Sequence, residues 1–389
     1  MERKVWKKFS LMLSLLLLFS IITPLVFIPS AAPVLASFYG TENDFDYATV
    51  MNEPRVIDAE DSVATLLSKA ELKNIKLYPG GIPFGVKFMT EGILIVGFCD
   101  ISNSTKKENP SSTAGLKLND RIISVDGKEL SSAAQFTEMV ENSNGHALSV
   151  IYIRNGERYT TTLTPVYSQK EQCYKTGMYV KDNGAGIGTV TYIVPESFSF
   201  AGLGHGICEG DKGKLVPIQR GAVVGVTING IVKGQCGTPG EVKGYFSSGK
   251  TGTLLQNTGC GVFGVFASLP SGLPSEPLSL CLKEELKEGK AYIYSTLDEG
   301  TPKKYEIQIE QINRSATEGK CFTVKVTDPA LLEKTGGIVQ GMSGSPIIQN
   351  GKLVGAVTHV MINDPTTGYG IFIENMLNAS QMNVMPRAA

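Results

Sequence analysis

Short apolar segments recur along residues 169–389 at intervals of roughly 10–25 residues, with glycine-rich turns between them. Examples are GIGTVTYIV (186–194), GAVVGVTI (221–228), CFTVKVTD (321–328) and SPIIQNGKLVGAVTHVM (345–361). Few helical patterns lie between these segments. Strands at such spacing pair with their neighbours, so the region is expected to form an all-β barrel or sandwich. The chain holds 43 glycines among 389 residues, which suits many tight turns.

Residues 76–167 form a second β-rich unit. PGGIPFGVKF (79–88) is a Gly/Pro loop that leads into a strand, and GILIVGFCDI (92–101) is an apolar strand. SAAQFTEMVEN (132–142) carries its apolar residues at helical spacing, and Asn-Gly at 155–156 predicts a two-residue hairpin turn. The pattern indicates a small barrel with one or two helices.

The stretch AGLKLNDRIISVDGKEL (114–130) gives this unit a family resemblance. Its Ala-Gly-Leu, Asp-Arg-Ile and Val-Asp-Gly triplets are similar to those of bacterial PDZ domains, which bind extended peptides at a sheet edge. The resemblance implies a groove opposite the helix 132–142. It would be lined by Gly80, Gly81, Ile82, Phe84, Gly85 and Val86. The alternative is a PDZ domain that only packs against its neighbour.

The first 36 residues have the pattern of an export segment. Basic residues occupy positions 3, 4, 7 and 8, an apolar run covers 9–28, and small residues follow at 31, 32 and 36. This is typical of a signal peptide, and the run is also long enough for a retained membrane anchor. Both readings place the rest of the chain outside the cytoplasm. Residues 37–75 are expected to be a linker.

Charge and cysteine usage argue against several classes of protein. With 36 basic and 37 acidic residues, the chain shows no basic patch for a nucleic-acid partner. The seven cysteines form no CxxC pair and are expected to be buried free thiols. With three histidines and no Cys/His cluster, no metal site is predicted, and no cofactor is expected.

The stretch VQGMSGSPI (339–347) offers two candidate nucleophiles, Ser343 and Ser345. Gly341 lies two residues before Ser343, so the backbone can curl until the N–H groups of Gly341 and Ser343 converge as an oxyanion hole. The esterase pattern G-x-S-x-G fails, because position 345 is serine. A hairpin after the serine favours a β-barrel peptidase with Ser343 as the nucleophile.

A general base for such a serine is most often a histidine. His205 lies between Gly204 and Gly206, which would leave its imidazole accessible. His146 sits at a hairpin entry and is expected on the surface. His359 lies in a strand, where a packed or edge histidine is expected.

Three aspartates between His205 and Ser343 could orient the base: Asp211, Asp298 and Asp328. Asp211 lies in a charged run, and Asp298 lies in a turn. Asp328 ends a strand, where a side chain is held rigidly, and is favoured over the other two.

The whole pattern is similar to a known peptidase family. GMSGSP resembles the nucleophile segment of chymotrypsin-like proteases. FAGLGHGI (200–207), VTDPALLEKTGGIVQGMSGSP (326–346) and LYPGGIPFGVKF (77–88) resemble the stage IV sporulation protein B (SpoIVB) peptidases of endospore-forming bacteria. The resemblance implies a mainly β chain: a PDZ domain followed by a chymotrypsin-like double β-barrel at 168–389. It also implies that His205, Asp328 and Ser343 form the catalytic triad.

The same resemblance implies a function. Members are serine endopeptidases released from the forespore into the space between the forespore and mother-cell membranes. They cleave themselves and a membrane-bound regulator of an intramembrane metalloprotease, which leads to activation of a late sigma factor. The alternative is a non-catalytic, peptide-binding PDZ scaffold.

Overall fold

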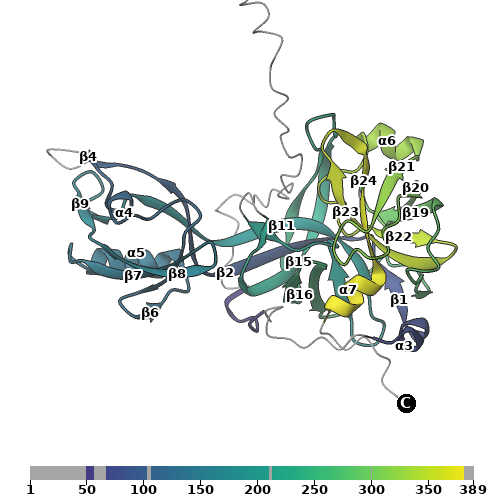
Figure 1. Cartoon of the computed structure of the whole chain (residues 1–389), viewed down its shortest axis with the longest axis horizontal. Coiled ribbons are helices and arrows are strands. Elements are labelled where there is room, and N and C mark those ends of the chain that lie inside the picture. The colour runs from purple at the N-terminus through teal and green to yellow at the C-terminus, as the bar shows by residue number, and fades with distance from the viewer. Residues whose placement is uncertain (1–49, 57–66, 103–106, 210–212, 299, 381–389) are drawn as a thin grey trace, which may run out of the picture.

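The computed structural model describes residues 50–56, 67–102, 107–209, 213–298 and 300–380. The expected signal or anchor segment, residues 1–36, lies outside these ranges. In the described part of the chain, no helix is both long and apolar enough to cross a membrane. Figure 1 shows two lobes, a small β-rich one and a larger one, joined by two long strands, β2 and β11.

The first barrel of the large lobe closes on itself through six antiparallel pairings, from β2 through β15, β16, β17, β12 and β11 back to β2. The strands are β2 (Pro83–Phe98), β11 (Met178–Ile193), β12 (Ser199–Gly202), β15 (Ile218–Val232), β16 (Glu241–Thr258) and β17 (Gly261–Phe266). Phenylalanines fill its centre: the rings of Phe84 and Phe200 meet edge-on with centroids 5.5 Å apart.

The second barrel is also closed and six-stranded, in the order β19-β20-β21-β24-β23-β22. Its strands are β19 (Gly289–Ser295), β20 (Lys303–Glu310), β21 (Phe322–Val326), β22 (Pro346–Gln349), β23 (Lys352–Met361) and β24 (Asp364–Phe372). Alternate residues point inward, as Ala291 and Ile293 do on β19 and Ile307 and Ile309 on β20, all of them fully buried. The predicted double barrel is confirmed.

The small lobe is the PDZ unit, with its own core around Ile93, Ile122, Phe136 and Val150. Its elements are β3 (Ile101–Ser102), β4 (Lys107–Glu108), α4 (Pro110–Thr113), β5 (Arg121–Val125), β6 (Lys128–Glu129), α5 (Ala133–Asn142), β7 (Leu148–Arg154), β8 (Glu157–Leu163), β9 (Val166–Ser168) and β10 (Cys173–Lys175). The expected helix is α5, and the expected hairpin joins β7 to β8.

The PDZ unit is inserted into the first barrel and does not precede it. Residues 83–89 of β2 pair with β15 and β11 in the barrel, and only Ile93 and Leu94 reach β5 of the small lobe. β11 returns the chain, with its residues 178–181 paired to the distal end of β2. At 16 residues each, these strands are about 50 Å long, which is enough for each to form part of both lobes. Residues 83–89 therefore lie in the first barrel, although the sequence predicted that the PDZ unit begins at residue 76.

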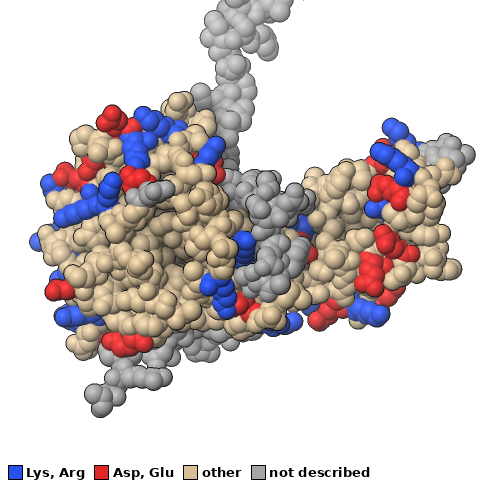
Figure 2. Space-filling model, turned by 180° about the vertical axis from the view of Figure 1, so that it is seen from behind, with Lys and Arg blue, Asp and Glu red and all other residues tan. Residues whose placement is uncertain are grey.

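The described residues also form shorter elements: α3 (Lys69–Asn74), β1 (Lys76–Pro79), β13 (Cys208–Glu209), β14 (Lys214–Leu215), β18 (Leu278–Ser279), α6 (Pro329–Thr335) and α7 (Ile373–Ala379). Acidic and basic side chains are interspersed over both lobes on the face shown in Figure 2. This distribution agrees with the balanced charge of the sequence.

Candidate active site

Ser343 lies in the loop that connects α6 to β22 of the second barrel. This loop is fastened to β11 of the first barrel: the N–H of Thr189 donates to the Ser343 carbonyl at 2.9 Å, and the Thr189 hydroxyl donates to the Gly341 carbonyl at 2.7 Å. Gly344 has φ +96°, and a Cβ there would lie 1.9 Å from the Thr189 carbonyl oxygen. Glycine at 344 is therefore required for the two barrels to approach this closely.

Some of the backbone N–H groups around Ser343 donate a hydrogen bond and others do not. Those of Gln340, Met342, Gly344 and Ser345 each donate to a backbone carbonyl. Within the described part of the chain, no hydrogen bond uses the N–H of Gly341 or of Ser343. Two unpaired donors flanking a serine hydroxyl match the requirement of an oxyanion hole.

The two serines of the loop have different environments. The Ser343 hydroxyl is half-buried and donates to the Thr358 carbonyl at 2.6 Å. Ser345 is fully buried, and its hydroxyl has no hydrogen-bond partner among the described residues. Only Ser343 lines a pocket beside the barrel junction.

His205 follows β12, the third strand of the first barrel. The backbone before it is left-handed at Leu203 (φ 65°) and Gly204 (φ 67°), which turns the chain sharply toward the second barrel. Its Nδ1 lies 2.9 Å from the carbonyl oxygen of Gly206. A carbonyl only accepts, so Nδ1 carries the hydrogen and Nε2 is left with its lone pair.

Burial lowers the pKa of His205 below its usual 6.5, and the hydrogen bond to the Gly206 carbonyl acts in the opposite direction. The imidazole is therefore neutral at pH 7 and able to accept a proton. His205 and Ser343 line the same small pocket, with a volume of about 30 Å³. Its remaining walls are Ile187, Leu203, Ile338, Val339, Gln340, Gly341, Thr358, His359 and Val360.

Asp328 lies elsewhere. It is the N-cap residue of α6: its Oδ1 accepts from the N–H groups of Ala330 and Leu331, and its Oδ2 accepts from the N–H of Glu306. It does not line the pocket of Ser343. Asp328 therefore caps α6 outside this pocket, and its assignment as the residue that orients the histidine stays a prediction. Asp328 followed by Pro329 is a signal for a helix start, which explains the local structure.

Asp298 also has partners of its own outside this pocket. Asp298 pairs with Lys303 and Lys334, which lowers the pKa of its carboxyl group. Asp211 lies outside the described residues. His146 is exposed in the PDZ lobe, as expected.

The ring beside His205 is His359, with centroids 4.7 Å apart and planes inclined by 34°. The sequence offered it only as a packed or edge residue. The sequence near position 359 does not predict this contact, because His205 comes from the other barrel, more than 150 positions away in the chain.

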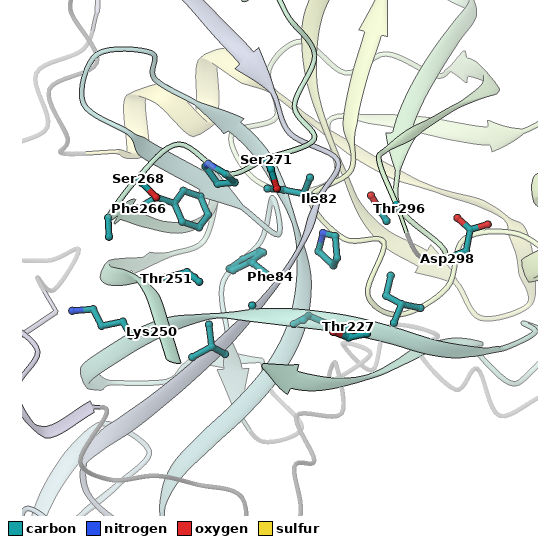
Figure 3. A pocket seen from close by; sticks show the side chains of 18 residues that line it. Ile82, Phe84, Thr227, Lys250, Thr251, Phe266, Ser268, Ser271, Thr296 and Asp298 are labelled. Carbon is teal, nitrogen blue, oxygen red and sulfur yellow. The ribbon is translucent and has the colours of Figure 1, made fainter. Parts of the chain in front are cut away.

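The residues expected to line a PDZ peptide groove are also placed differently. Gly85 and Val86 pair with β15 and β11 within the first barrel, and Gly80 and Gly81 bond to the β11 backbone. Ile82 and Phe84 line a pocket of about 560 Å³ between the barrels, whose other walls include Thr227, Lys250 and Asp298 (Figure 3). These residues thus belong to a barrel strand and to the turn that leads into it, and their role in peptide binding stays a prediction.

The seven cysteines are all unpaired. Burial raises the pKa of Cys260 to about 12 and that of Cys281 to about 11, so neither thiol ionises near pH 7.

Comparison with known proteins gives two family matches. Residues 172–377, more than half of the chain, match the family SpoIVB peptidase S55, and residues 85–164 match the PDZ domain. A Neisseria meningitidis protein, named as a candidate zinc metalloprotease, is 27% identical over 74 residues. The match covers 19% of this chain and only 17% of that protein.

Two solved structures resemble parts of the chain. The Rv3671c protease of M. tuberculosis in its active form has 15% identity and a TM-score of 0.27, covering 49% of this chain and 71% of that one. The PDZ domain of the SdrC-like protein Lmo2051 from Listeria monocytogenes has 14% identity and a TM-score of 0.19, covering 23% of this chain and 87% of that one.

Proposed function

The chain belongs to the SpoIVB peptidase S55 family and is a serine peptidase, and on this premise we propose that Ser343 and His205 carry out peptide-bond cleavage in sporulation signalling. The observation that carries the assignment is the pair of unpaired N–H groups at Gly341 and Ser343, beside a serine that shares its pocket with a neutral histidine.

The chemistry follows from this arrangement. The Ser343 hydroxyl turns from the Thr358 carbonyl to attack the scissile carbonyl carbon, and its proton passes to Nε2 of His205. The N–H groups of Gly341 and Ser343 donate to the oxyanion that forms. His205 then delivers the proton to the leaving amine, and water hydrolyses the acyl-enzyme by the same steps in reverse. The Gly206 carbonyl keeps the hydrogen on Nδ1 throughout.

For the substrates and the location of the enzyme, we extend the known role of the family to this chain. The substrates we propose are the chain itself and a membrane-bound regulator of an intramembrane metalloprotease, cleaved in the space between forespore and mother cell, with a late sigma factor activated downstream. The apolar segment 9–28 supports export, with the N-terminus either removed or kept as a membrane anchor. The PDZ unit supports recognition of extended peptides.

Labelling by a fluorophosphonate probe tests the catalytic assignment. The wild-type full chain should be labelled, and Ser343→Ala should not be. Ser345→Ala is the matched control, since it removes a hydroxyl two residues away, and should still be labelled. A folded wild type that stays unlabelled would reject the assignment and favour a non-catalytic, peptide-binding scaffold.

Self-cleavage tests the proposed substrate. Full-length wild type should be shortened near its N-terminus during expression, whereas Ser343→Ala should keep its full length. Mass spectrometry of the product gives the bond that is cut. An uncut wild type that still reacts with the probe would remove self-cleavage from the proposal and leave the peptidase activity in place.

A further inference from the structure

The short loop between β10 and β11 in the PDZ lobe carries backbone N–H groups without an acceptor. Within the described part of the chain, no hydrogen bond uses the N–H of Thr176 or of Gly177, although both residues are buried. Native structures rarely leave a buried N–H group unpaired, because its lost hydration is then not compensated. Two adjacent donors of this kind are able to bind an anion.

The carbonyl groups of the same two residues hold the loop in place. The Thr176 carbonyl accepts from the N–H and the hydroxyl of Ser111, at 2.9 and 2.7 Å. The Gly177 carbonyl accepts from the Cys99 N–H at 3.0 Å and from Nδ2 of Asn109 at 2.9 Å. Gly177 has φ +77°, and a Cβ there would lie 2.8 Å from the Cys99 carbonyl oxygen, so the position requires glycine. The loop is therefore fixed by its acceptors, and its donors stay available.

Strand β11 continues from this loop with one edge free. Met178 lies opposite Phe98 of β2, and the Cys99 N–H donates to the Gly177 carbonyl beside them, so the two form a non-hydrogen-bonded pair. The N–H and the carbonyl of Met178 therefore point away from β2. Over Met178–Val180, no strand other than β2 pairs with β11 among the described residues. An edge of this kind can take up an extended peptide as an added strand.

Helix α5 lies beside this part of the chain. At the start of the helix, the N–H of Ala133 donates to the Asp182 carboxylate at 2.7 Å. Beyond its end, the Tyr174 ring packs on Gly145, where a Cβ would lie 2.7 Å from the ring. The segment 174–182 therefore runs alongside α5 in the opposite direction. Half-buried apolar side chains of the helix and the strand pack on the core of the PDZ lobe: Ala133, Met139, Met178 and Val180.

The direction of β11 determines which end of a peptide would meet the loop. A peptide that pairs antiparallel with the free edge runs opposite to β11, so its last residue lies at the start of the strand. The unpaired N–H groups of Thr176 and Gly177 lie at this end. Lys175 adds a positive charge next to them, with its Nζ 2.9 Å from Glu171 and its side chain 35% exposed. Backbone donors and a cation at the end of an added strand are suited to a C-terminal carboxylate.

We propose that the loop 175–177 and the free edge of β11, with α5 beside them, bind the C-terminus of an extended peptide. The free carboxylate accepts from the N–H groups of Thr176, Gly177 and Met178, and the last side chain is apolar, like the side chains around it. The strand of this site continues into the first barrel, so the site is built by the PDZ and peptidase units together. The inference rests on the proposed recognition of extended peptides by the PDZ unit, and it does not require that Ser343 is catalytic.

Peptide binding to the full chain with Ser343→Ala, which keeps the probe from being cut, tests this by fluorescence anisotropy. The probes are fluorescent hexapeptides that end in Val, Leu, Phe or Ala, each as the free acid and as the C-terminal amide. At least one free acid should bind about tenfold or more tightly than its amide, because the amide lacks the charge. Met178→Pro should weaken binding of that acid by about tenfold or more. It removes one donor, and no bond of the sheet is lost because this N–H points away from β2.

Lys175→Glu is a second variant, which keeps the test decisive if Met178→Pro does not fold. It places a negative charge beside the donors, so it should weaken the free acid by about threefold or more and leave the amide unchanged. Lys128→Glu is the matched control, since it reverses an exposed charge elsewhere on the PDZ lobe, and should bind the acid without change.

The inference fails if the amides bind as tightly as the acids, which would leave recognition of extended peptides in place without a carboxylate site. It also fails if folded Met178→Pro and Lys175→Glu bind the acid without change. Equal weakening by Lys128→Glu and Lys175→Glu would assign the effect to the charge of the whole lobe, and would overturn it as well. A folded chain that binds no peptide in either form rejects the proposed peptide recognition itself, so the two failures are distinguishable.

Discussion

The Thr189 hydroxyl in the first barrel donates a 2.7 Å hydrogen bond to the carbonyl of Gly341, two residues before Ser343 in the second. Strand β11 runs from the PDZ lobe to Thr189. The same strand therefore belongs to the PDZ lobe at one end and holds the nucleophile loop at the other. One side chain ties the loop of one barrel to the wall of the other.

Thr189→Val should weaken this link while keeping the shape of the side chain. Thr189 is 4% exposed, so leaving the Gly341 carbonyl without its donor should cost about 1–2 kcal/mol of unfolding free energy. The labelling rate of Ser343 should fall by about tenfold or more, because the loop loses its register. Thr161→Val removes a 2.7 Å hydroxyl-to-carbonyl bond in the PDZ lobe and serves as the control, with unchanged labelling. If Thr189→Val and Thr161→Val are labelled at the same rate, the hydrogen bond from Thr189 to Gly341 does not affect the reactivity of Ser343.

Asp328→Asn and Asp328→Ala separate helix capping from catalysis. Asparagine is also a good N-cap residue, so Asp328→Asn should keep peptidase activity within a few-fold of wild type. Asp328→Ala should lose about 1 kcal/mol of stability in urea denaturation and little activity per folded molecule. A loss of about 1,000-fold or more in kcat for a fully stable Asp328→Asn would instead support Asp328 as the orienting acid.

The pH dependence of kcat/KM should follow His205. The base works only when neutral, and burial lowers its pKa below 6.5, so activity should persist as pH falls to 6.5 and be lost at lower pH. The measurement is hydrolysis of a peptide substrate between pH 4.5 and 8. A midpoint above 6.5 would contradict the burial of the base.

Acid stability should depend on His359. Its pKa is about 3 when folded and ordinarily about 6.5 when unfolded, so the unfolded chain binds the extra proton. The corresponding stability is fully present above pH 6.5 and is lost as pH falls toward 3. His359→Phe should therefore lose less unfolding free energy than wild type between pH 7 and pH 4.5, as measured by urea denaturation. Identical losses in both proteins would contradict the low pKa.

The pocket beside Ser343 should set a size limit on substrates. Its volume of about 30 Å³ and its mostly apolar walls favour a small uncharged side chain before the scissile bond. Val360→Ala should enlarge this pocket and shift the cleavage preference, measured with a peptide library, toward larger residues. Thr227→Ala, in the separate pocket of Figure 3, should leave the profile unchanged. A wild type that prefers bulky or charged residues would contradict the limit.

The sequence by itself determined the elements and much of the chemistry. The apolar segments predicted the strands, the helical spacing at 132–142 predicted α5, and Asn-Gly predicted the β7–β8 turn. The glycines around Ser343 selected it over Ser345, and the structure leaves the two expected N–H groups unpaired. These features are local, since each depends on residues a few positions apart.

Only the tertiary structure decided which distant residues meet. Asp328 was placed by its position in the chain, but the N–H groups of α6 and Glu306 take up its carboxylate. The loop 79–84 was assigned to the PDZ unit, but β2 is long enough to serve both lobes. His359 reaches His205 because a bulge in one barrel meets a left-handed turn in the other. Such contacts depend on how two closed barrels pack, which no short stretch of sequence encodes.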